Sequence, residues 1–368
     1  MERGLYIHIP FCKRKCLYCD FCSFSGSENL MMDYSMSLAK EICDIGECKI
    51  KTIFIGGGTP TYLSCEAWEI IGKSVKNLNK SRELEFTVEG NPGTLSYEKL
   101  KFLKSLGVNR LSIGLQAVQN DLLKRLGRIH TYEEFLEGYN MARAMGFKNI
   151  NVDLMFGLPN QSLDDWKDTL NTIVKLNPEH ISAYSLIIEE GTEFYQSFNE
   201  GRLLLPSEDE ERDMYRFTLD YLKSKGYEHY EISNFSKPGK ESRHNLLYWD
   251  LDEYIGCGAG AHSYVDGKRY SNENSIDKYI NRAVNHADIH LNTLHDTMEE
   301  FMFMGLRKIE GISINKFNKK FKSNIFEVYG DVINKYLKTG LMSRDGDKIK
   351  LTDRGIEISN SVMCEFMF

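Results

Sequence analysis

The sequence predicts an α/β fold in which six βα units curl into a partial barrel. Two observations support this fold. Short runs of β-branched and aromatic residues recur between residues 5 and 188, and amphipathic segments with apolar residues at helical spacing separate them. Parallel strands need crossover connections, which these segments supply, and a barrel would gather the carboxyl ends of all six strands around one cavity. An open doubly wound sheet is the alternative.

The expected elements alternate in order along the chain. Strands are expected at residues 5–9, 52–56, 84–90, 110–116, 149–157 and 180–188, and helices at residues 34–45, 67–78, 97–106, 132–145 and 163–174. Gly107 and Gly146 follow two of these helices at positions typical of a C-cap. Ser162 and Asp165 have the spacing of a capping box at the start of the last helix.

Beyond the six units the pattern changes. An acidic helix is expected from about residue 207 to residue 226, and residues 227–280 are rich in aromatic residues and glycine with no βα period. From residue 295 onward, three helices precede a turn at residues 344–346 between two short strands, which is the outline of a small winged-helix domain. We therefore expect three parts: a barrel at residues 1–230, a mixed extension at residues 231–294 and a winged-helix-like domain at residues 295–368.

The composition is that of an ordinary globular protein. The chain has 368 residues, of which 42% are hydrophobic, and 46 basic side chains against 53 acidic ones give a net charge of -7. Proteins that bind duplex nucleic acid usually carry a basic surface, so no nucleic acid partner is expected despite the winged-helix outline. The sequence has no apolar run of about 18 residues and no signal peptide at its start, so we expect a cytoplasmic protein that is not integral to a membrane.

Four of the nine cysteines form a group directly after the first expected strand. In a reducing compartment such a group binds metal more often than it forms disulfides. Cys12, Cys16 and Cys19 have a compact Cys-x3-Cys-x2-Cys spacing, whereas structural zinc sites commonly use two Cys-x2-Cys pairs separated by a longer loop. Three thiolates would leave one iron of a four-iron cluster open to a further ligand. Zinc is the alternative metal, and Cys22 is an alternative fourth ligand that we expect not to bind.

Motifs along nearly the whole chain resemble one protein family. The stretch YIHIPFCKRKCLYCDF at residues 6–21 is similar to the cluster loop of radical S-adenosylmethionine (SAM) proteins in the coproporphyrinogen oxidase-like group. The resemblance implies a radical SAM barrel, a [4Fe-4S] cluster on the three cysteines and SAM on the open iron. Further motifs follow in the family's order: GGGTPT (56–61), FTVEGNP (86–92), RLSIGLQ (110–116), LGR (126–128), VDLMFGLP (152–159) and HNLLYW (244–249).

The resemblance also implies which residues bind SAM. Gly57, Gly58 and Thr59 would hold the methionine part, using backbone groups for its amino end, and Tyr6 and Tyr18 would flank the methionine or the adenine. The other SAM residues lie in or after the later strands. Glu89 and Asp153 would bind the ribose, and Gln116 and Arg128 would lie near the carboxylate. Tyr184 and Ser185 would line the adenine pocket. Independently of the family, an acid within an apolar strand is rarely buried unless it is paired or binds a ligand.

Two functions fit this family. The first is a heme chaperone, which binds heme and delivers it to an acceptor protein, and the second is the SAM-dependent oxidative decarboxylation of coproporphyrinogen III. Three features favour the chaperone: the chain reaches the cluster strand by Leu5 without a long preceding segment, Phe21 stands where the oxidases carry a further cysteine, and HNLLYW resembles a signature of the chaperone branch. A radical enzyme with an unrelated substrate is a third alternative. The sequence identifies neither the heme acceptor nor the electron donor.

The HNLLYW motif contains the expected heme residues. His244 offers an imidazole for the heme iron, and Tyr248 and Trp249 offer aromatic surface for a porphyrin. The alternative for His244 is a packed structural histidine. Cys257 and His262, in the glycine-rich stretch that follows, are further candidates for heme or metal ligation. The histidine of the first strand, His8, is expected to be packed and hydrogen-bonded in the core, and no catalytic residue is assigned.

Overall fold

The computed structural model describes residues 2–281 and 286–367. Within these residues, six parallel strands form the centre of one large sheet and follow the order of the chain. The sheet does not close, because the first and sixth strands pair with β9 and β8 and not with each other. The predicted series of parallel βα units is confirmed. The strands are β1 (Glu2–Ile9), β2 (Lys49–Gly57), β3 (Lys80–Gly90), β4 (Arg110–Gln116), β5 (Ile150–Phe156) and β6 (His180–Ser185).

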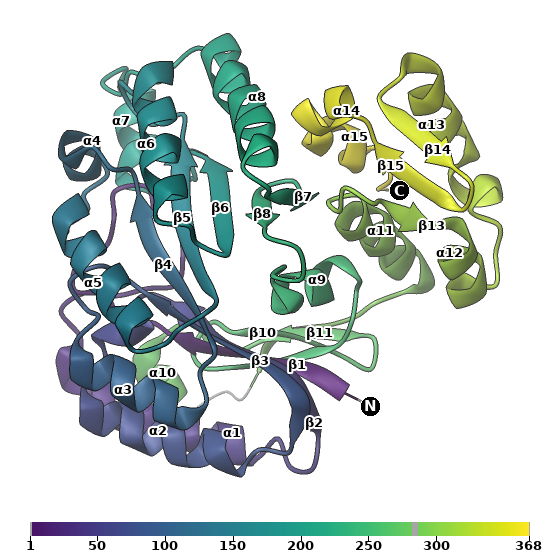
Figure 1. Cartoon of the computed structure of the whole chain (residues 1–368). Helices are drawn as coiled ribbons and strands as arrows, with labels where there is room; N and C mark the ends of the chain where they lie inside the picture. Colours follow the sequence, from purple (N-terminus) through teal and green to yellow (C-terminus); the bar gives the residue numbers. More distant parts are fainter. Residues whose placement is uncertain (1, 282–285, 368) are drawn as a thin grey trace.

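Helices connect the successive parallel strands and cover the outer side of the sheet (Figure 1). All seven residues of β4 are buried, as expected for a central parallel strand with both faces covered. The connecting helices are α1 (Met31–Cys43), α2 (Cys65–Asn77), α3 (Tyr97–Leu106), α4 (Asn120–Arg125), α5 (Tyr132–Ala144) and α6 (Leu163–Lys175), with 3-10 turns η1 (Glu28–Leu30) and η2 (Pro60–Tyr62) before α1 and α2.

Local sequence signals start and stop these helices. The Ser162 hydroxyl accepts a hydrogen bond from the Asp165 N–H, and the Asp165 carboxylate accepts one from the Ser162 N–H, so the predicted capping box is present at α6. Gly107 ends α3 in the left-handed conformation, with φ of 99°. Gly146, with φ of 80°, follows α5 in the same way. Helix α4 was not predicted, because six residues are too few to show a helical period.

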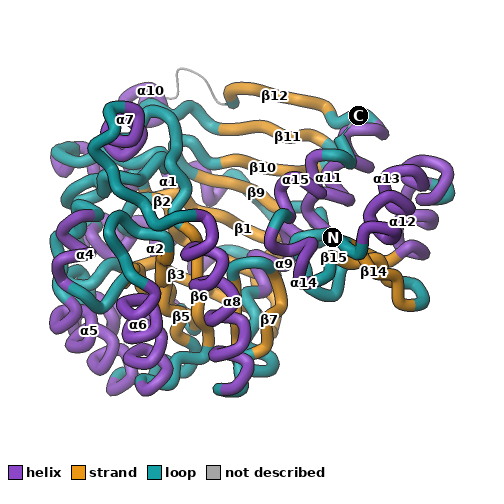
Figure 2. The backbone as a smooth tube through the Cα atoms, turned by 90° about the horizontal axis from the view of Figure 1, so that it is seen from above, coloured by secondary structure: helices purple, strands orange, loops and turns teal. Residues whose placement is uncertain are grey.

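The segment without a readable βα period extends the sheet at both edges. Figure 2 shows β9 to β12 side by side beyond β1. Strand β9 runs parallel to β1, and β10 to β12 continue from it as antiparallel strands. These strands have three to five residues each, which is too short for a clear alternation of apolar and polar positions. The added strands are β7 (Glu228–Glu231), β8 (Asn234–Ser236), β9 (Tyr254–Cys257), β10 (His262–Val265), β11 (Lys268–Ser271) and β12 (Ala287–Leu291).

Four further helices lie between β6 and the C-terminal part of the chain. The predicted acidic helix is present as α8, and the HNLLYW motif lies on the short helix α9. The helices are α7 (Glu193–Asn199), α8 (Glu208–Ser224), α9 (Arg243–Trp249) and α10 (Ile276–Asn281).

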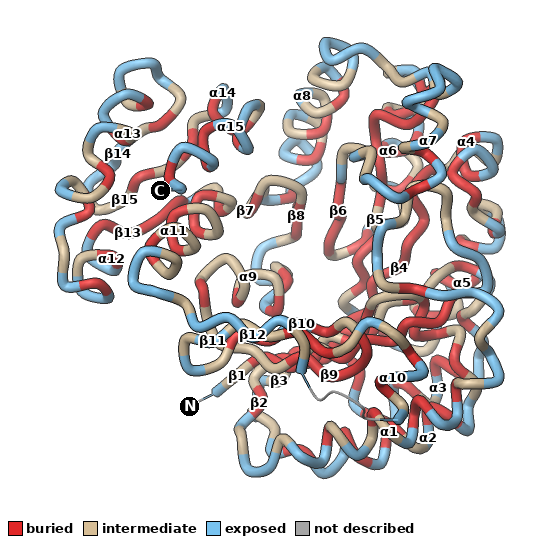
Figure 3. Tube along the Cα trace, turned by 180° about the vertical axis from the view of Figure 1, so that it is seen from behind, coloured by how far each residue is buried: buried red, intermediate tan, exposed pale blue. Residues whose placement is uncertain are grey.

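The C-terminal part has a hydrophobic core of its own, to which Leu251 and Tyr264 of the preceding segment also belong. The observed order of three helices followed by a hairpin agrees with the predicted outline. Figure 1 shows this part beyond α8 and α9, and Figure 3 shows buried positions at its centre as well as along the strands of the large sheet. Its elements are α11 (Leu294–Gly305), β13 (Ile312–Ser313), α12 (Ile314–Phe321), α13 (Ile325–Thr339), β14 (Met342–Asp345), β15 (Lys348–Leu351), α14 (Asp353–Glu357) and α15 (Ser359–Cys364).

Among the residues that the structure describes, no helix combines the length and the apolar character that crossing a membrane requires.

Candidate functional site

A cavity of about 430 Å³ lies at the carboxyl ends of the six parallel strands. Each strand, or the loop directly after it, contributes to the lining, because parallel strands of a barrel-like sheet bring their carboxyl ends to one rim. All of the predicted cluster and SAM residues except Tyr6 and Thr59 line this cavity. In chain order these are Cys12, Cys16, Tyr18, Cys19, Gly57, Gly58, Glu89, Gln116, Arg128, Asp153 and Ser185, and Tyr184 lies among them.

The cysteine loop is held against the end of β1 by backbone hydrogen bonds. The Cys12 N–H donates to the Phe24 carbonyl at 2.9 Å, and the Phe24 N–H donates to the Pro10 carbonyl at 2.7 Å. Cys22 does not line this first cavity; it lines a neighbouring one, and its Sγ lies 3.5 Å from the carbonyl oxygen of Asn274. The loop therefore separates three cysteines from the fourth.

The three cysteines of the first cavity have the chemistry that a cluster requires. Burial raises the pKa of the Cys12 thiol and of the Cys19 thiol, so a metal that binds them as thiolates would displace protons. Within residues 2–281 and 286–367, no three His, Cys, Asp or Glu side chains gather closely enough to hold one metal ion. A four-iron cluster distributes its thiolates over different irons, and the three thiols of this loop supply the kind of donor that it requires.

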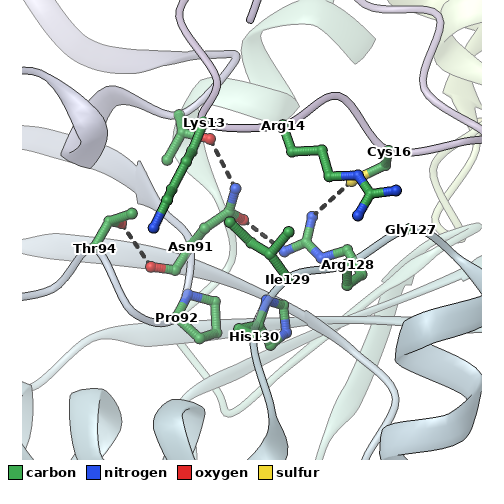
Figure 4. Close-up of a pocket in the computed structure, with 11 residues that line it drawn as sticks. Lys13, Arg14, Cys16, Asn91, Pro92, Thr94, Gly127, Arg128, Ile129 and His130 are labelled. Atoms are coloured by element: carbon green, nitrogen blue, oxygen red, sulfur yellow. Dashed lines mark hydrogen bonds between the residues drawn. The ribbon is translucent and has the colours of Figure 1, made fainter.

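Arg128 places a positive charge beside these thiols (Figure 4). Its Nη1 lies 3.3 Å from the Cys16 Sγ, and its Nη2 donates to the Asn91 Oδ1 at 2.7 Å and to the Gly114 carbonyl at 2.5 Å. Asn91 in turn donates to the Thr59 hydroxyl at 2.7 Å. The guanidinium is thereby fixed in orientation, and its buried Nε has no hydrogen-bond partner among the described residues. That unpaired donor suits an anionic ligand group.

Two carboxyl groups face the same cavity from β3 and β5. The Glu89 Oε2 accepts a hydrogen bond from the Gly57 N–H at 3.2 Å, and Asp153 accepts from the Ser112 hydroxyl at 3.1 Å and from the Asn151 amide at 2.6 Å. Burial and then the Asp153 charge raise the pKa of Glu89 to about 8, and burial raises the pKa of Asp153. For both groups, the cost of burying the negative charge exceeds the stabilisation that these hydrogen bonds give. Hydroxyl donors or a cation would therefore stabilise the ionised carboxylates.

Gln116 is buried at the end of β4 in an unusual backbone conformation. Its φ is 78°, a region that residues other than glycine seldom adopt, and its side-chain Oε1 has no hydrogen-bond partner in the described part of the chain. Such strain is often found at ligand sites, and the Gln116 side chain lines the first cavity.

The two predicted glycines are needed for close approach of the cysteine loop. Gly57 has φ of 111°, and a Cβ at Gly57 would lie 2.5 Å from the His8 ring. A Cβ at Gly58 would lie 2.8 Å from the Phe11 carbonyl oxygen and 3.0 Å from the Cys12 Sγ. The Gly58 N–H donates to the Ile9 carbonyl at 2.8 Å. The glycine-rich turn therefore packs directly beneath the predicted cluster ligands.

Tyr6 and Thr59 are the two predicted SAM residues that lie elsewhere. The Tyr6 hydroxyl is hydrogen-bonded to the His8 Nδ1 at 2.8 Å, and both side chains line the neighbouring cavity. His8 is buried and hydrogen-bonded at both ring nitrogens, the second bond joining its Nε2 to the Cys22 carbonyl at 2.7 Å, as expected for a core histidine. Thr59 lies between the Cys12 thiol, 3.6 Å away, and Asn91, so its side chain supports the cysteine loop.

The neighbouring cavity has a volume of about 360 Å³ and shares part of its wall with the first. Phe21, Gly57 and Glu89 line both cavities. The sequence did not predict this second cavity, and it also missed Asn91 and Ser112 in the first. Asn91 lies two positions after the motif glutamate and directly follows the end of β3, and that position could have indicated it. The second cavity is lined by Tyr6, His8, Phe21, Cys22, Gly57, Glu89, Tyr248, Tyr254, Gly260, His262 and Asn274.

The three predicted heme residues do not come together in one cavity. His244 is buried, and its ring is hydrogen-bonded on both sides, to the Thr52 hydroxyl and to the Tyr248 hydroxyl, each at 2.8 Å. Burial and then the Arg110 charge lower the pKa of His244 to about 3, so the ring is neutral. Trp249 stacks on the Arg307 guanidinium at 4.4 Å and does not line the second cavity, whereas Tyr248 does. This arrangement matches the packed alternative for His244.

Known proteins resemble the chain over its whole length. The Radical SAM superfamily pattern matches residues 6–173, and the HemN C-terminal domain pattern matches residues 292–358. The heme chaperone HemW of Bacillus subtilis (strain 168) is 40% identical over 99% of both chains, and that of Lactococcus lactis is 40% identical over 98% of this chain and 96% of its own. Coproporphyrinogen III oxidase (HemN) from Escherichia coli, described as a radical SAM enzyme, shares the fold with a TM-score of 0.86 at 21% identity, over 99% of this chain and 89% of the other.

The fold and the relatives agree. The α/β radical SAM fold accounts for the strand-end cavity, and the identity to the curated relatives extends from the cysteine loop through the C-terminal part. The chain therefore belongs to the radical SAM family that includes the curated relatives named heme chaperone HemW.

Proposed function

We propose that the protein is a heme chaperone that carries a [4Fe-4S] cluster on Cys12, Cys16 and Cys19, binds SAM on the open iron and delivers heme to an acceptor protein. The observation that carries this proposal is the 40% identity, over nearly the full length of both chains, to relatives named heme chaperone. Besides heme, the proposal requires two partners, an acceptor protein and an electron donor for the cluster.

The lining of the first cavity supports the cofactor assignment. A cluster on the cysteine loop would supply single electrons to the bound sulfonium. Glu89 and Asp153 would accept hydrogen bonds from the ribose hydroxyls, and their raised pKa values would fall again beside the positively charged sulfonium. Gln116 and the free Nε of Arg128 would bind the amino and carboxylate groups. The assignments of Gln116 and Arg128 each satisfy a polar atom that has no partner among the described residues.

The alternative function is oxidation of coproporphyrinogen III. The oxidase shares the fold, but at 21% identity this likeness says nothing about the substrate. Phe21 also stands where the resemblance places a further cysteine in the oxidases, and its aromatic ring borders both cavities. These observations favour the chaperone.

One paired assay distinguishes the two functions. Full-length protein with its cluster reconstituted without oxygen is titrated with ferric heme by absorbance, and the same preparation is incubated with coproporphyrinogen III, SAM and a reductant. We expect stoichiometric heme binding and no conversion. Formation of protoporphyrinogen would overturn the proposal in favour of the oxidase, and failure of both assays would point to a radical protein with another substrate.

The cluster assignment has its own test. Alanine substitutions of Cys12, Cys16 and Cys19 are each expected to abolish the four-iron cluster, because each removes one thiolate ligand. Cys22→Ala is the matched control, since its thiol lines the other cavity, and it is expected to keep the cluster. Iron and sulfide analysis measures the outcome, and loss of the cluster in Cys22→Ala would refute the three-ligand assignment.

A further inference from the structure

The second cavity combines aromatic walls with two lining residues of the cysteine loop, Phe21 and Cys22. Four aromatic side chains line it, and two of them, Tyr248 and Tyr254, pack edge to face with centroids 4.7 Å apart. Phe21 lies at its border with the first cavity and is 61% exposed. Aromatic and apolar surface of this kind suits a flat macrocycle such as a porphyrin. At about 360 Å³, the cavity is within the usual size range of ligand sites.

Two imidazoles line this cavity, and they differ in their availability. Both ring nitrogens of His8 are hydrogen-bonded within the core. His262 begins strand β10, is exposed, and its ring makes no hydrogen bond to any residue that the structure describes. A neutral imidazole nitrogen with its lone pair free is a common axial ligand of heme iron. His262 is therefore available for ligation without the loss of an existing contact.

Of the HNLLYW motif, Tyr248 lines the second cavity and His244 does not. His244 and Tyr248 are four residues apart on α9 and so lie on one helical face, where the Tyr248 hydroxyl meets the His244 ring. The other ring nitrogen is hydrogen-bonded to Thr52 of β2. This chain of hydrogen bonds fixes Tyr248 in the cavity wall. Ligation of iron by His244 would require breaking one of the two bonds and exposing a buried ring.

We propose that the second cavity is the heme site, that His262 binds the heme iron, and that His244 is a positioning residue which holds Tyr248 against the porphyrin. This inference rests on the proposed heme-chaperone function and names the ligand within it. Coordination involves donation of an imidazole lone pair to ferric iron and no change of oxidation state.

The test uses full-length protein with its cluster reconstituted and ferric heme as the probe. Wild type is compared with three variants: His262→Ala, His244→Gln and Cys22→Ala. Magnetic circular dichroism reports imidazole ligation of ferric heme independently of heme transfer, and a titration gives the dissociation constant. Iron and sulfide content serves as the folding control, because His262 is exposed and lies away from the cluster ligands.

We expect His262→Ala to lose the imidazole signature and to bind heme at least tenfold more weakly, and added free imidazole to restore the signature. His244→Gln and Cys22→Ala should keep the signature. Retention of the signature by His262→Ala, or its loss only in His244→Gln or Cys22→Ala, would overturn the inference. If wild type binds heme without an imidazole ligand, this inference alone fails; if it binds no heme, the proposed function fails as well.

Discussion

Replacing Glu89 by glutamine is expected to stabilise the cofactor-free protein and at the same time to weaken its affinity for SAM. The glutamine has nearly the same shape as the glutamate, and its Oε1 can still accept the hydrogen bond from the Gly57 N–H. The substitution removes the ability to ionise and replaces one carboxyl oxygen by an amide nitrogen. Glu89 faces a cavity that is proposed to bind the cationic SAM. Its negative charge should therefore destabilise the cofactor-free protein and strengthen the binding of SAM.

The size of the effect follows from the raised pKa of Glu89, about 8 against the ordinary value of 4.5. Each pKa unit is worth about 1.4 kcal/mol, so at pH 7, where the unfolded chain releases the proton and the folded chain keeps it, the raised pKa destabilises the folded, cofactor-free protein by on the order of 3 kcal/mol. The cost is absent below pH 4.5, where the group is protonated in both states, grows as the pH rises, and is complete above about pH 8. Loss of a charge-assisted hydrogen bond to the ribose should weaken SAM binding about tenfold or more.

The assay is urea denaturation of the cofactor-free proteins at pH 5.5 and pH 8.5, with a calorimetric SAM titration of the reconstituted proteins. Glu89→Gln should gain more stability over wild type at the higher pH. Glu137→Gln, the same substitution at an exposed position of α5, should change stability by no more than about 0.5 kcal/mol at either pH. Equal gains at both pH values, or destabilisation at pH 8.5, would refute the reasoning.

Two further predictions concern the cysteine loop. Gly58→Ala should abolish the cluster while circular dichroism shows a folded chain, because the added Cβ would lie 3.0 Å from the Cys12 Sγ. The control is Gly330→Ala, at a helical position with open space around it. This variant should keep the cluster and stabilise the folded protein by about 0.5–1 kcal/mol. Arg128→Gln should lower the reduction potential of the cluster in an EPR-monitored titration, since a buried positive charge favours the reduced state, whereas Arg125→Gln on the exposed side of α4 should not. An unchanged potential in Arg128→Gln would show that its charge does not act on the cluster.

The sheet could be predicted because its signals are local and repeated. Strands such as residues 110–116 carry leucine or isoleucine at every second position, and the intervening helices carry caps such as Ser162 and Gly107 that can be read from neighbouring positions. Once parallel strands are expected, the residues at their carboxyl ends are expected to meet. The placement of most predicted residues around one cavity follows from this rule, although their individual roles stay predictions.

The division into two cavities could not be predicted, because it depends on contacts between distant parts of the chain. Tyr6 has the position of a strand residue near the cluster loop, yet its side chain shares a cavity with residues of β9 and β10, which pair beside β1. The edge strands that build this second wall are too short to show a period. The sequence alone therefore does not indicate that Tyr6 and Tyr248 line the same cavity.

The contacts of His244 in the HNLLYW motif also depend in part on a distant segment of the chain. Its spacing could have indicated a contact between His244 and Tyr248, since residues four apart on a helix face each other. The partner that occupies the second ring nitrogen, Thr52, lies on β2, and only the folded chain brings it within 2.8 Å. A histidine beside two aromatic residues therefore resembles a ligand in the sequence, whereas in the folded chain both of its ring nitrogens are hydrogen-bonded.

The wall shared by the two cavities bears on how SAM and heme could influence each other. Glu89 lines both, and its ionisation is the property that a nearby sulfonium would change most. If SAM binding draws Glu89 into its anionic form, the heme cavity gains a negative charge beside its border. A ligand shifts the affinity for another only through such a differential interaction, and the effect must be reciprocal. On the two proposals together, a chain that binds SAM without turnover would still use it, because the cofactor would set the charge at the edge of the heme site.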